Sequence, residues 1–577
     1  MNTKKEHLTR RDMLKLSAAA LGGAMLACGK GEQLVQTTAP QSPTPTSPPE
    51  LAADTVLRNG NILTIDSADS VAEAVSVKDG LIQAVGTTTE IDDLVGEATK
   101  VIELGGKTAT PGLIDAHNHF QVVGLMNSYY IPFLPPDILT VDDLQDALAE
   151  AVGQVGEGEW IKGYFLFVKD VDFPTRHILD PVSPDNPVFI LQQGGHYGSA
   201  NSRALEIAGI TADTPNPTGG VIGRDPDGEP NGVFYNHRAM DLVRLHMPIY
   251  TQDEVMANIQ SSQRLFSASG VTSFQDNNVR GPGTVATYLD AGRQNEMYMR
   301  GAVYYTLEWP GDVDRALNEI EHYDDDFMRF AGFKFLLDGQ MTMAYCYEPH
   351  NGDRWDMPTW DPDVFKDAVR KLHDTGLQIC VHCVGDATTD LALDAFEEAM
   401  DANPRPDPRH RLEHAIITRP ESTQRIKDLG VIVSTQPQFI RLGGDLYADL
   451  IGEERARRVM VTREWLDAGI PVALGSDAPS TPWHSPLATL IGAITRATFS
   501  GAIHEPDQAL SPYEALQAHT LTAAYAAHEE AIKGSIEVGK MADLIVWSAN
   551  PIRSTAEELW NSTIDLTMID GKIVHQV

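Results

Sequence analysis

Cysteine is scarce in this chain, which has 4 cysteines in 577 residues. Cys28 lies in an N-terminal segment that we expect to stay outside the fold. Cys346, Cys380 and Cys383 then remain, and an odd remainder implies no disulfide framework. Cys380 and Cys383 have the C-x-x-C spacing of a redox pair or of half a zinc ribbon, but a ribbon needs a second pair and the chain has none. We therefore favour two thiols packed in a buried strand.

Basic residues are also in short supply, since 44 Lys and Arg stand against 81 Asp and Glu and leave a net charge of −37. Binding to a phosphate backbone needs a basic face, so this composition argues against nucleic acid as a partner. Adhesion to anionic lipid is disfavoured for the same reason. The length of 577 residues exceeds one ordinary core, so we expect two or more folded units.

Long apolar runs are missing as well, and the short apolar stretch after Arg10 and Arg11 cannot form a stable membrane span. Residues 1–28 instead have the build of an export signal. Their pattern T-R-R-D-M-L-K resembles a twin-arginine signal, the route of proteins exported already folded. Met25-Leu26-Ala27-Cys28 resembles a lipoprotein cleavage box. We expect a periplasmic protein or a lipoprotein anchored through Cys28, with cleavage without lipid as the alternative.

The two ends of the mature chain differ from its middle. Residues 29–52 are rich in Pro, Thr, Ser and Gln and predict a disordered tether. Short strand patterns with hairpin turn pairs such as Asn59-Gly60 and Asp570-Gly571 fill residues 53–109 and 534–577. These patterns predict one small β-sandwich built from both ends.

The middle, residues 110–533, alternates apolar strands with helical patterns. Continuous apolar runs spaced by helices are typical of parallel strands buried on both faces. Eight such units predict an α/β fold, a (β/α)8 barrel of the triosephosphate isomerase (TIM) type, with an inserted subdomain at about residues 121–269. The eight strands are expected in "PGLIDAHNHF", "GVTSFQDN", "MRGAVYYTL", "AGFKFLLDG", "LQICVHCVGD", "RHRLEHAII", "VIVSTQPQF" and "PVALGSDAP".

Polar side chains end several of these strands, although a parallel core strand has no ordinary use for them. In a barrel of this kind the chemistry takes place at the carboxyl ends of the strands. The side chains found there are His117 and His119 on the first strand, Lys334 on the fourth, His382 on the fifth, His414 on the sixth and Asp477 on the eighth.

A shared metal ion accounts for these groups. Side chains alternate along a strand, so His117 and His119 lie on one side and both can reach one ion. Four neutral imidazoles and a carboxylate suit Zn²⁺ or a similar borderline ion. Taken singly, His414 could be a satisfied core histidine, Asp477 a turn cap and Lys334 a side chain that reaches the rim. Their joint position at the same end of different strands favours the metal site.

The chain from about residue 55 to its end resembles the amidohydrolase superfamily, specifically amidohydrolase family 3, the YtcJ-like branch. "PGLIDAHNHF" is similar to the first metal motif, "FKFLLDGQ" to the lysine strand, "VHCVGDAT" and "RLEHA" to the later histidine motifs, and "LGSDAP" to the aspartate motif. The resemblance implies that His117, His119 and Asp477 hold one divalent metal and that His382 and His414 hold a second. Members of the superfamily differ in metal count, so one ion or two stays open.

The resemblance also implies a reaction. Lys334 would be N-carboxylated and bridge the metals, which would remove its costly buried charge. Asp477 would take a proton from metal-activated water and pass it to a leaving nitrogen, while His196 from the insertion would help to polarise the carbonyl. The implied activity is hydrolysis of carbon–nitrogen bonds other than peptide bonds in a small-molecule substrate.

Other functions stay open on the sequence alone. A metal-dependent isomerase, deaminase or lactonase would use the same ligands, and a catalytically silent surface lipoprotein is a further alternative. After Asp338-Gly339 the chain continues with "QMTMAYCYEP", bulkier than the small residues and serine common in the branch. This segment indicates either local packing or a reshaped substrate pocket. Whether the subunits form a homo-oligomer is not encoded in any motif.

Overall fold

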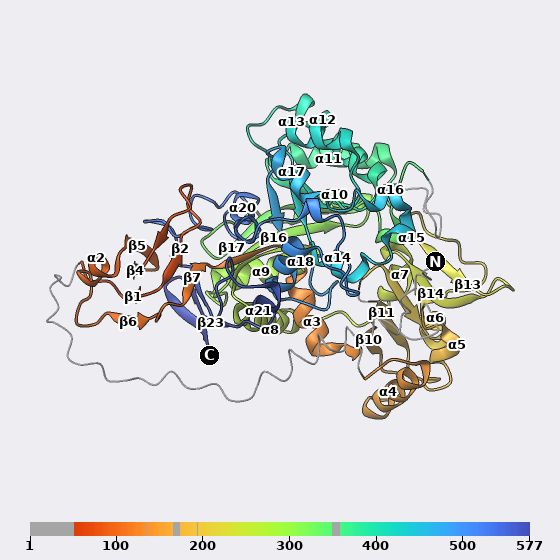
Figure 1. The fold of residues 1–577 in the computed structure, drawn as a ribbon. Helices are drawn as coiled ribbons and strands as arrows, with labels where there is room; N and C mark the ends of the chain where they lie inside the picture. Colours follow the sequence, from red (N-terminus) through yellow and green to blue (C-terminus); the bar gives the residue numbers. More distant parts are fainter. Residues whose placement is uncertain (1–50, 135–136, 166–172, 193, 349–357) are drawn as a thin grey trace, which may run out of the picture.

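The computed structural model describes residues 51–134, 137–165, 173–192, 194–348 and 358–577. The predicted export signal, and the linker up to residue 50, lie outside these residues. No helix within them is both long and apolar enough to cross a lipid bilayer. Figure 1 shows a barrel in the middle, a β-sandwich at one end and an inserted sheet at the other end.

The centre of the molecule is an eight-stranded parallel sheet in the order β21-β20-β19-β18-β17-β16-β15-β8. It nearly closes between its two outer strands, where the Asp477 amide donates to the His117 carbonyl at 2.7 Å. The predicted (β/α)8 barrel is confirmed, and each predicted strand segment supplies one strand. They are β8 (Leu113–Asn118), β15 (Val271–Val279), β16 (Arg300–Leu307), β17 (Met328–Leu336), β18 (Gln378–Cys383), β19 (Arg411–His414), β20 (Ile432–Thr435) and β21 (Val472–Leu474).

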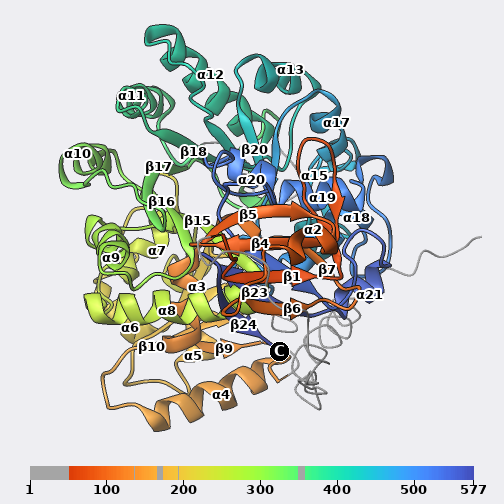
Figure 2. The same ribbon diagram turned by 90° about the vertical axis from the view of Figure 1, so that its left-hand side faces the viewer.

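Helices cover the outside of the barrel, and Figure 2 shows α9 to α13 arranged around it. Proline occupies the first turn of α9, α10, α11, α13, α18 and α19, where its missing N–H leaves no helical hydrogen bond unmade. The helices are α8 (Gln252–Ala268), α9 (Pro282–Arg293), α10 (Pro310–Glu319), α11 (Pro362–His373), α12 (Asp386–Ala402), α13 (Pro420–Asp428), α14 (Gln438–Gly443), α15 (Tyr447–Ile451), α16 (Glu453–Ala456), α17 (Thr462–Asp467), α18 (Pro486–Thr495), α19 (Pro512–Ala518) and α20 (Leu521–Tyr525).

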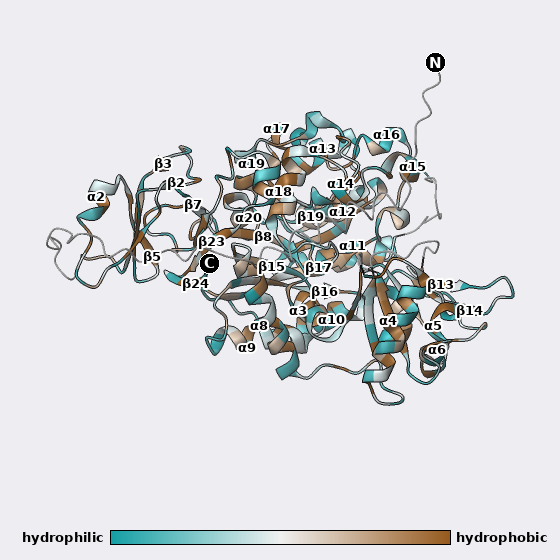
Figure 3. Ribbon diagram, turned by 60° about the horizontal axis from the view of Figure 1, so that its bottom comes forward, coloured by the Kyte–Doolittle hydropathy of each residue, from teal (hydrophilic) through white to brown (hydrophobic). Residues whose placement is uncertain are grey.

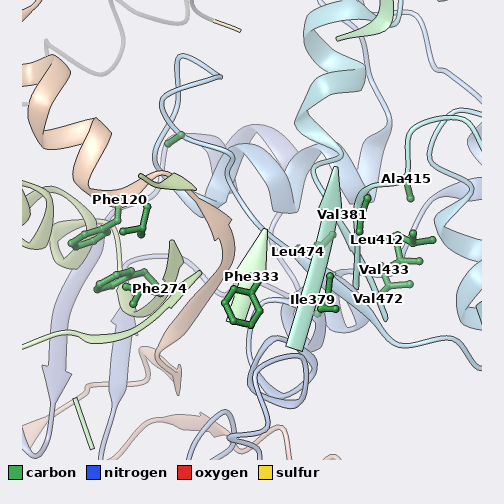
Figure 4. Close-up of a cluster of buried hydrophobic side chains, with 14 of the residues drawn as sticks. Phe120, Phe274, Phe333, Ile379, Val381, Leu412, Ala415, Val433, Val472 and Leu474 are labelled. Carbon is green, nitrogen blue, oxygen red and sulfur yellow. The ribbon is translucent and has the colours of Figure 1, made fainter. Parts of the chain in front are cut away.

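The core of the barrel wall is apolar because its strands pack against helices on one face and against one another on the other. Fully burying one such side chain contributes about 1.5–3 kcal/mol. Phe120 and Phe274 stack with ring centroids 3.7 Å apart and tie α3 (Phe120–Tyr129) to β15. Figure 4 shows the cluster on the neighbouring strands, formed by Phe333, Ile379, Val381, Leu412, Val433, Val472 and Leu474.

The β-sandwich consists of two sheets, one formed by N-terminal strands alone and one that combines strands from both ends of the chain. The four-stranded sheet has the order β5-β4-β1-β6 and the six-stranded sheet the order β24-β23-β22-β7-β2-β3. The C-terminal strand β22 pairs antiparallel with β7, and the Trp547 indole donates to Thr110 Oγ1 at 2.9 Å. The elements are β1 (Thr55–Arg58), β2 (Asn61–Leu63), β3 (Val71–Ala72), β4 (Ala74–Lys78), β5 (Leu81–Gly86), α2 (Thr88–Asp92), β6 (Lys100–Glu103), β7 (Thr108–Pro111), β22 (Leu544–Trp547), α21 (Ala556–Trp560), β23 (Ile564–Ile569) and β24 (Lys572–Gln576).

Between β8 and β15 the chain forms a separate six-stranded sheet in the order β13-β14-β12-β11-β10-β9. The helices α3 and α8, which flank this sheet in sequence, pack on each other and on β15. Figure 3 shows α4 with alternating apolar and polar faces. The elements are β9 (Ile131–Phe133), α4 (Val141–Gln154), β10 (Ile161–Phe165), α5 (Arg176–Leu179), β11 (Val188–Gln192), β12 (Tyr197–Ala200), α6 (Ser202–Ala208), β13 (Val221–Arg224), β14 (Pro230–Tyr235) and α7 (His237–Arg244).

At the amino-terminal side of the barrel strands, a pair of buried histidines satisfies backbone groups. The Ile379 amide donates to His410 Nδ1 at 3.1 Å, so His410 carries its proton on Nε2 and donates to His373 Nδ1 at 2.8 Å. His373 in turn donates from Nε2 to the Asn403 carbonyl at 2.9 Å. Burial lowers the pKa of both rings, and that of His410 lies well below its usual value.

This pair predicts a loss of stability in mild acid. The unfolded chain takes up protons on both histidines below about pH 6.5, whereas the folded chain resists them, so stability falls as the pH decreases. Replacing His410→Asn keeps an acceptor for the Ile379 amide and removes one titrating ring. The Tm should therefore fall less between pH 7.5 and 5.5 in this variant than in the wild type. Equal falls in both proteins would contradict the prediction.

Candidate metal centre

Three side chains converge at the carboxyl ends of the first and last barrel strands. His117 Nε2 lies 3.3 Å from Asp477 Oδ1, and His119 Nε2 lies 2.9 Å from the same oxygen. Ligand atoms of the three residues lie within 4.8 Å of one another. His117 and Asp477 are buried, and His119 is 16% exposed. His117 lies on β8 and His119 follows that strand directly as the N-cap of α3, and the near closure of the barrel brings both to the loop after β21 that carries Asp477.

The donor set of this group fits a divalent cation. His117 Nε2 and Asp477 Oδ1 face each other, yet neither has a hydrogen-bond partner within the described part of the chain. Buried polar atoms left without a partner cost free energy, and a cation between them would satisfy both. Two imidazole nitrogens and a carboxylate are typical ligands of Zn²⁺ and related ions.

The other three predicted ligands lie around this group rather than within it. The His414 ring is 4.7 Å from the His117 ring and 4.4 Å from the His382 ring, measured between centroids. The His382 Nε2 atom faces the Gly339 carbonyl at 3.3 Å. Lys334 is 1% exposed on β17. The structure thus gathers all six side chains at one end of the barrel and forms one compact ligand group from three of them.

The protonation states of these residues suit metal binding. Burial lowers the pKa of His119, His382 and His414, which keeps the imidazoles neutral. Burial opposes the charge on Asp477, but the neighbouring His117 and the other histidines hold its pKa well below the usual range. Burial also lowers the pKa of Lys334, an effect that nearby carboxylates only partly offset.

Glu413 orients the first of these ligands and was missed by sequence reasoning. Its carboxylate accepts the Nδ1–H of His117 at 2.5 Å, which directs the Nε2 lone pair towards Asp477. Arg411 Nε lies 2.7 Å from Glu413 Oε1, and both side chains are fully buried. Arg411 also donates to the Ala116 carbonyl at 2.6 Å. The sequence feature that could have revealed Glu413 is the pair of opposite charges, Arg411 and Glu413, two residues apart in an apolar strand.

Two further buried carboxylates brace the loops that carry ligands. Asp115 accepts from the Ser476 amide and hydroxyl at 2.8 and 2.6 Å, which holds the Asp477 loop against β8. Asp338 accepts from the Gly385 amide at 2.8 Å and the Thr388 hydroxyl at 2.6 Å, which links the ends of β17 and β18. Burial raises the pKa of Asp115 to about 6 and that of Asp338 to about 7.

The backbone is strained at two of the predicted ligands. His414 has φ = 69° and Asp477 has φ = 52°, the left-handed region that residues other than glycine seldom adopt. Gln436 Oε1 accepts the Nδ1–H of His414 at 2.7 Å, which leaves Nε2 as the free ring nitrogen. Strained backbone persists only where the surroundings impose it, and functional sites collect such residues.

His196 reaches the centre from the insertion, at the start of β12. Its ring centroid lies 5.2 Å from that of His382. The residue is 8% exposed, and burial lowers its pKa to about 4, so the imidazole is neutral. Its Nδ1 is buried without a hydrogen-bond partner among the described residues. The ring is therefore placed to contact a molecule bound at the centre.

The C-x-x-C pair takes no part in the ligand group. Cys380 and Cys383 are fully buried on β18 and form no disulfide. Burial raises the pKa of both thiols. The prediction of two thiols packed in a buried strand is confirmed.

The segment after Asp338 lies beside the centre. Met341–Met343 form a short 3₁₀ helix, and Met343 is buried. The Thr342 hydroxyl contacts the Tyr197 hydroxyl of the insertion. Met341 and Phe439 pack partly buried on one apolar cluster, and the Phe439 ring lies 6.0 Å from His414. This packing accounts for part of the bulk of the segment.

A (β/α)8 barrel with buried imidazole and carboxylate side chains at the ends of its strands fits a metal-dependent enzyme. The model of the amidohydrolase family matches residues 100–575, and the chain belongs to this family. It is therefore an amidohydrolase-type enzyme that acts on small molecules.

Several named proteins are similar over nearly the whole chain. An N-substituted formamide deformylase of Arthrobacter pascens is 29% identical over 538 residues, which cover 91% of this chain and 98% of the relative. The putative amidohydrolase YtcJ of Bacillus subtilis is 27% identical over 536 residues, covering 90% and 99%. A metal-dependent hydrolase structure from Pyrococcus horikoshii covers 87% of this chain and 99% of its own, with a TM-score of 0.70 and 22% identity, which shows the shared fold.

The contact between Glu413 and His117 predicts weaker metal binding in Glu413→Gln. This change removes the carboxylate charge that fixes the ring and leaves Arg411 unpaired, so metal affinity should fall about 10–100-fold. The Kd can be measured by chelator competition, with Tm as the control for folding. The exposed Glu421→Gln change should leave the Kd unaltered. An unchanged Kd in Glu413→Gln would show that Glu413 does not orient His117 for metal binding.

Proposed function

We propose that this enzyme hydrolyses carbon–nitrogen bonds other than peptide bonds, in amides, formamides or cyclic amides, and that its metal is Zn²⁺. The compact group of His117, His119 and Asp477 carries the proposal, because two imidazoles and an ionised carboxylate surround one point at the mouth of the barrel. The similarity to a formamide deformylase over 91% of the chain supports the bond type.

In the proposed mechanism, His117, His119 and Asp477 would hold one ion. His382 and His414, whose lowered pKa keeps each ring neutral, would hold a second where two are present. A bound divalent ion supplies Lewis acidity, which acidifies water and polarises a carbonyl group. Asp477 takes the proton of the attacking water and delivers it to the leaving nitrogen as the carbon–nitrogen bond breaks.

Two further residues complete the proposed centre. Lys334 is buried with a lowered pKa, so a larger share of its amine is neutral and able to react with carbon dioxide. The product is a carbamate anion, formed with loss of one proton, and its oxygens would add Lys334 to the residues that hold the metal. His196 is neutral at pH 7 and would donate a hydrogen bond to the substrate carbonyl oxygen.

The alternatives differ in the bond attacked rather than in the ligands. An isomerase, deaminase or lactonase could use the same centre. A silent binding protein would have no need for three ligand atoms within 4.8 Å of one another. The substrate panel below distinguishes these functions.

A metal-loaded assay tests the reaction. N-formyl, N-acyl and cyclic amides should be hydrolysed, a lactone and an aminopurine should not, and chelation should abolish turnover. In His382→Ala, turnover should fall to background and bound metal should decrease, with the fold intact by circular dichroism. The exposed His246→Ala change serves as the control. Full activity of His382→Ala would show that His382 on β18 is not part of the metal centre. If only the lactone or the aminopurine were turned over, the proposed amide hydrolysis would be wrong.

We also propose that the protein is exported in folded form and anchored through Cys28, because of the paired arginines and the cleavage box in residues 1–28. In a bacterial expression host, labelled fatty acid should be incorporated into the wild type and not into Cys28→Ala. Arg10→Lys together with Arg11→Lys should keep the protein in the cytoplasm. Cleaved protein without label would support export without lipid.

A further inference from the structure

The insertion contributes a second histidine next to His196. His237 is the first residue of α7, and its ring centroid lies 5.0 Å from that of His196, which lies 5.2 Å from that of His382. A continuous series of ring contacts therefore leads from His382 to His237. His237 is an intermediate residue in exposure rather than a fully buried one.

The tautomer of His237 is fixed by its neighbour. Arg280 Nη2 lies 3.1 Å from His237 Nδ1. A guanidinium only donates hydrogen bonds, so Nδ1 must accept and Nε2 must carry the ring proton. Burial, together with the charge of Arg280, keeps the pKa of His237 well below its usual value. The ring is thus a neutral donor with a known orientation of its proton.

Arg280 is itself held in place from the barrel. Its Nε donates to Asn278 Oδ1 at 2.9 Å, and its Nη1 lies 2.6 Å from Glu308 Oε1. These contacts come from the carboxyl ends of β15 and β16, so the barrel determines which nitrogen of an insertion histidine is protonated.

The charges around His237 are balanced. Arg280 interacts with Glu308 and Asp241, and the two other guanidinium groups of this layer, Arg238 and Arg244, interact with the same carboxylates. Asp312 is a third carboxylate beside Arg238. A site with compensated charge favours a neutral hydrogen-bond acceptor over a carboxylate.

The start of α7 is fixed by an unusual backbone conformation. Asn236 is 1% exposed and has φ = 68°, which is strained for a residue other than glycine. Its side-chain oxygen accepts a hydrogen bond from the backbone amide of His237 at 2.8 Å. The backbone amide of Asn236 donates to the His196 carbonyl at 2.7 Å. Asn236 therefore ties the two histidines to each other.

We propose that His237 binds an uncharged oxygen of the substrate through its Nε2–H, at a distance from the bond that is cleaved, and that Arg280 and Glu308 are positioning residues that maintain this tautomer. The proposal rests on the proposed hydrolysis of amides and narrows its substrates. They carry a second acceptor, such as a carbonyl or hydroxyl oxygen, beyond the scissile group. The position of His196 between His237 and His382 places this contact away from the metal ligands.

Three matched amides test the proposal: one with a distal carbonyl, one with a methylene in its place and one with a distal carboxylate. The wild type should prefer the carbonyl compound over the methylene compound about 10-fold or more in kcat/KM. The reason is that the Nε2–H of His237, buried by the substrate without an acceptor, costs free energy. The carboxylate compound should be poorer than the carbonyl compound. His237→Leu should lose the preference mainly through KM, whereas His237→Gln, which keeps an N–H donor, should retain most of it.

The controls separate binding from chemistry and from folding. Metal content should be unchanged in both His237 variants, and His246→Leu should behave as the wild type. Retention of the preference in His237→Leu, or a preference of the wild type for the carboxylate, would overturn the proposal. If none of the amides is hydrolysed, the proposed reaction fails, and the same preference is then measured as equilibrium binding to the wild type.

Nitrogen-15 spectroscopy of labelled histidine tests the positioning residues directly. The His237 signal, identified by its absence in His237→Gln, should show an unprotonated Nδ1 and a protonated Nε2. In Arg280→Met the ring should populate both tautomers, while the metal content stays constant. A protonated Nδ1 in the wild type, or an unchanged signal in Arg280→Met, would exclude the proposed role of Arg280.

Discussion

The buried contact between Glu413 and His117 is the interaction on which the candidate centre depends. It links a guanidinium inside the barrel to an imidazole at its mouth, and all three side chains are fully buried. A buried charge is costly without a partner, so the arrangement holds only while every member is present. The same contact decides which nitrogen of His117 faces Asp477, and with it the geometry of the compact ligand group.

The centre is assembled from two structural sources. The barrel strands carry the predicted metal ligands on short, hydrogen-bonded ends, whereas the insertion supplies His196 and His237 from a sheet of its own. Rigid strands suit groups that must keep a fixed distance to an ion. An inserted sheet can vary in sequence without disturbing those strands, which makes it the natural place for side chains that select the substrate.

The barrel could be predicted from the sequence, because each strand is a continuous apolar run. The polar residues at the end of such a run are easily recognised. His117, Lys334 and Asp477 were predicted as ligands in this way. Glu413 and Arg411 were not predicted, because their role depends on contacts with strands more than 100 residues away in the sequence, such as the hydrogen bond from Arg411 to the Ala116 carbonyl. His237 lacks strand periodicity, and only the fold brings it to His196. Pairings across long sequence separations are set by packing and leave no local pattern.

The shared sheet of the β-sandwich also constrains how the chain is made. Strand β7 ends at Pro111, and its partner β22 begins at Leu544, some 430 residues later. At a synthesis rate of about 5–20 residues per second, the N-terminal strands emerge from the ribosome tens of seconds before their partner exists. During that interval β7 has an unpaired edge on the β22 side. The sheet of the β-sandwich that contains β7 can therefore be completed only after the last strands have been translated.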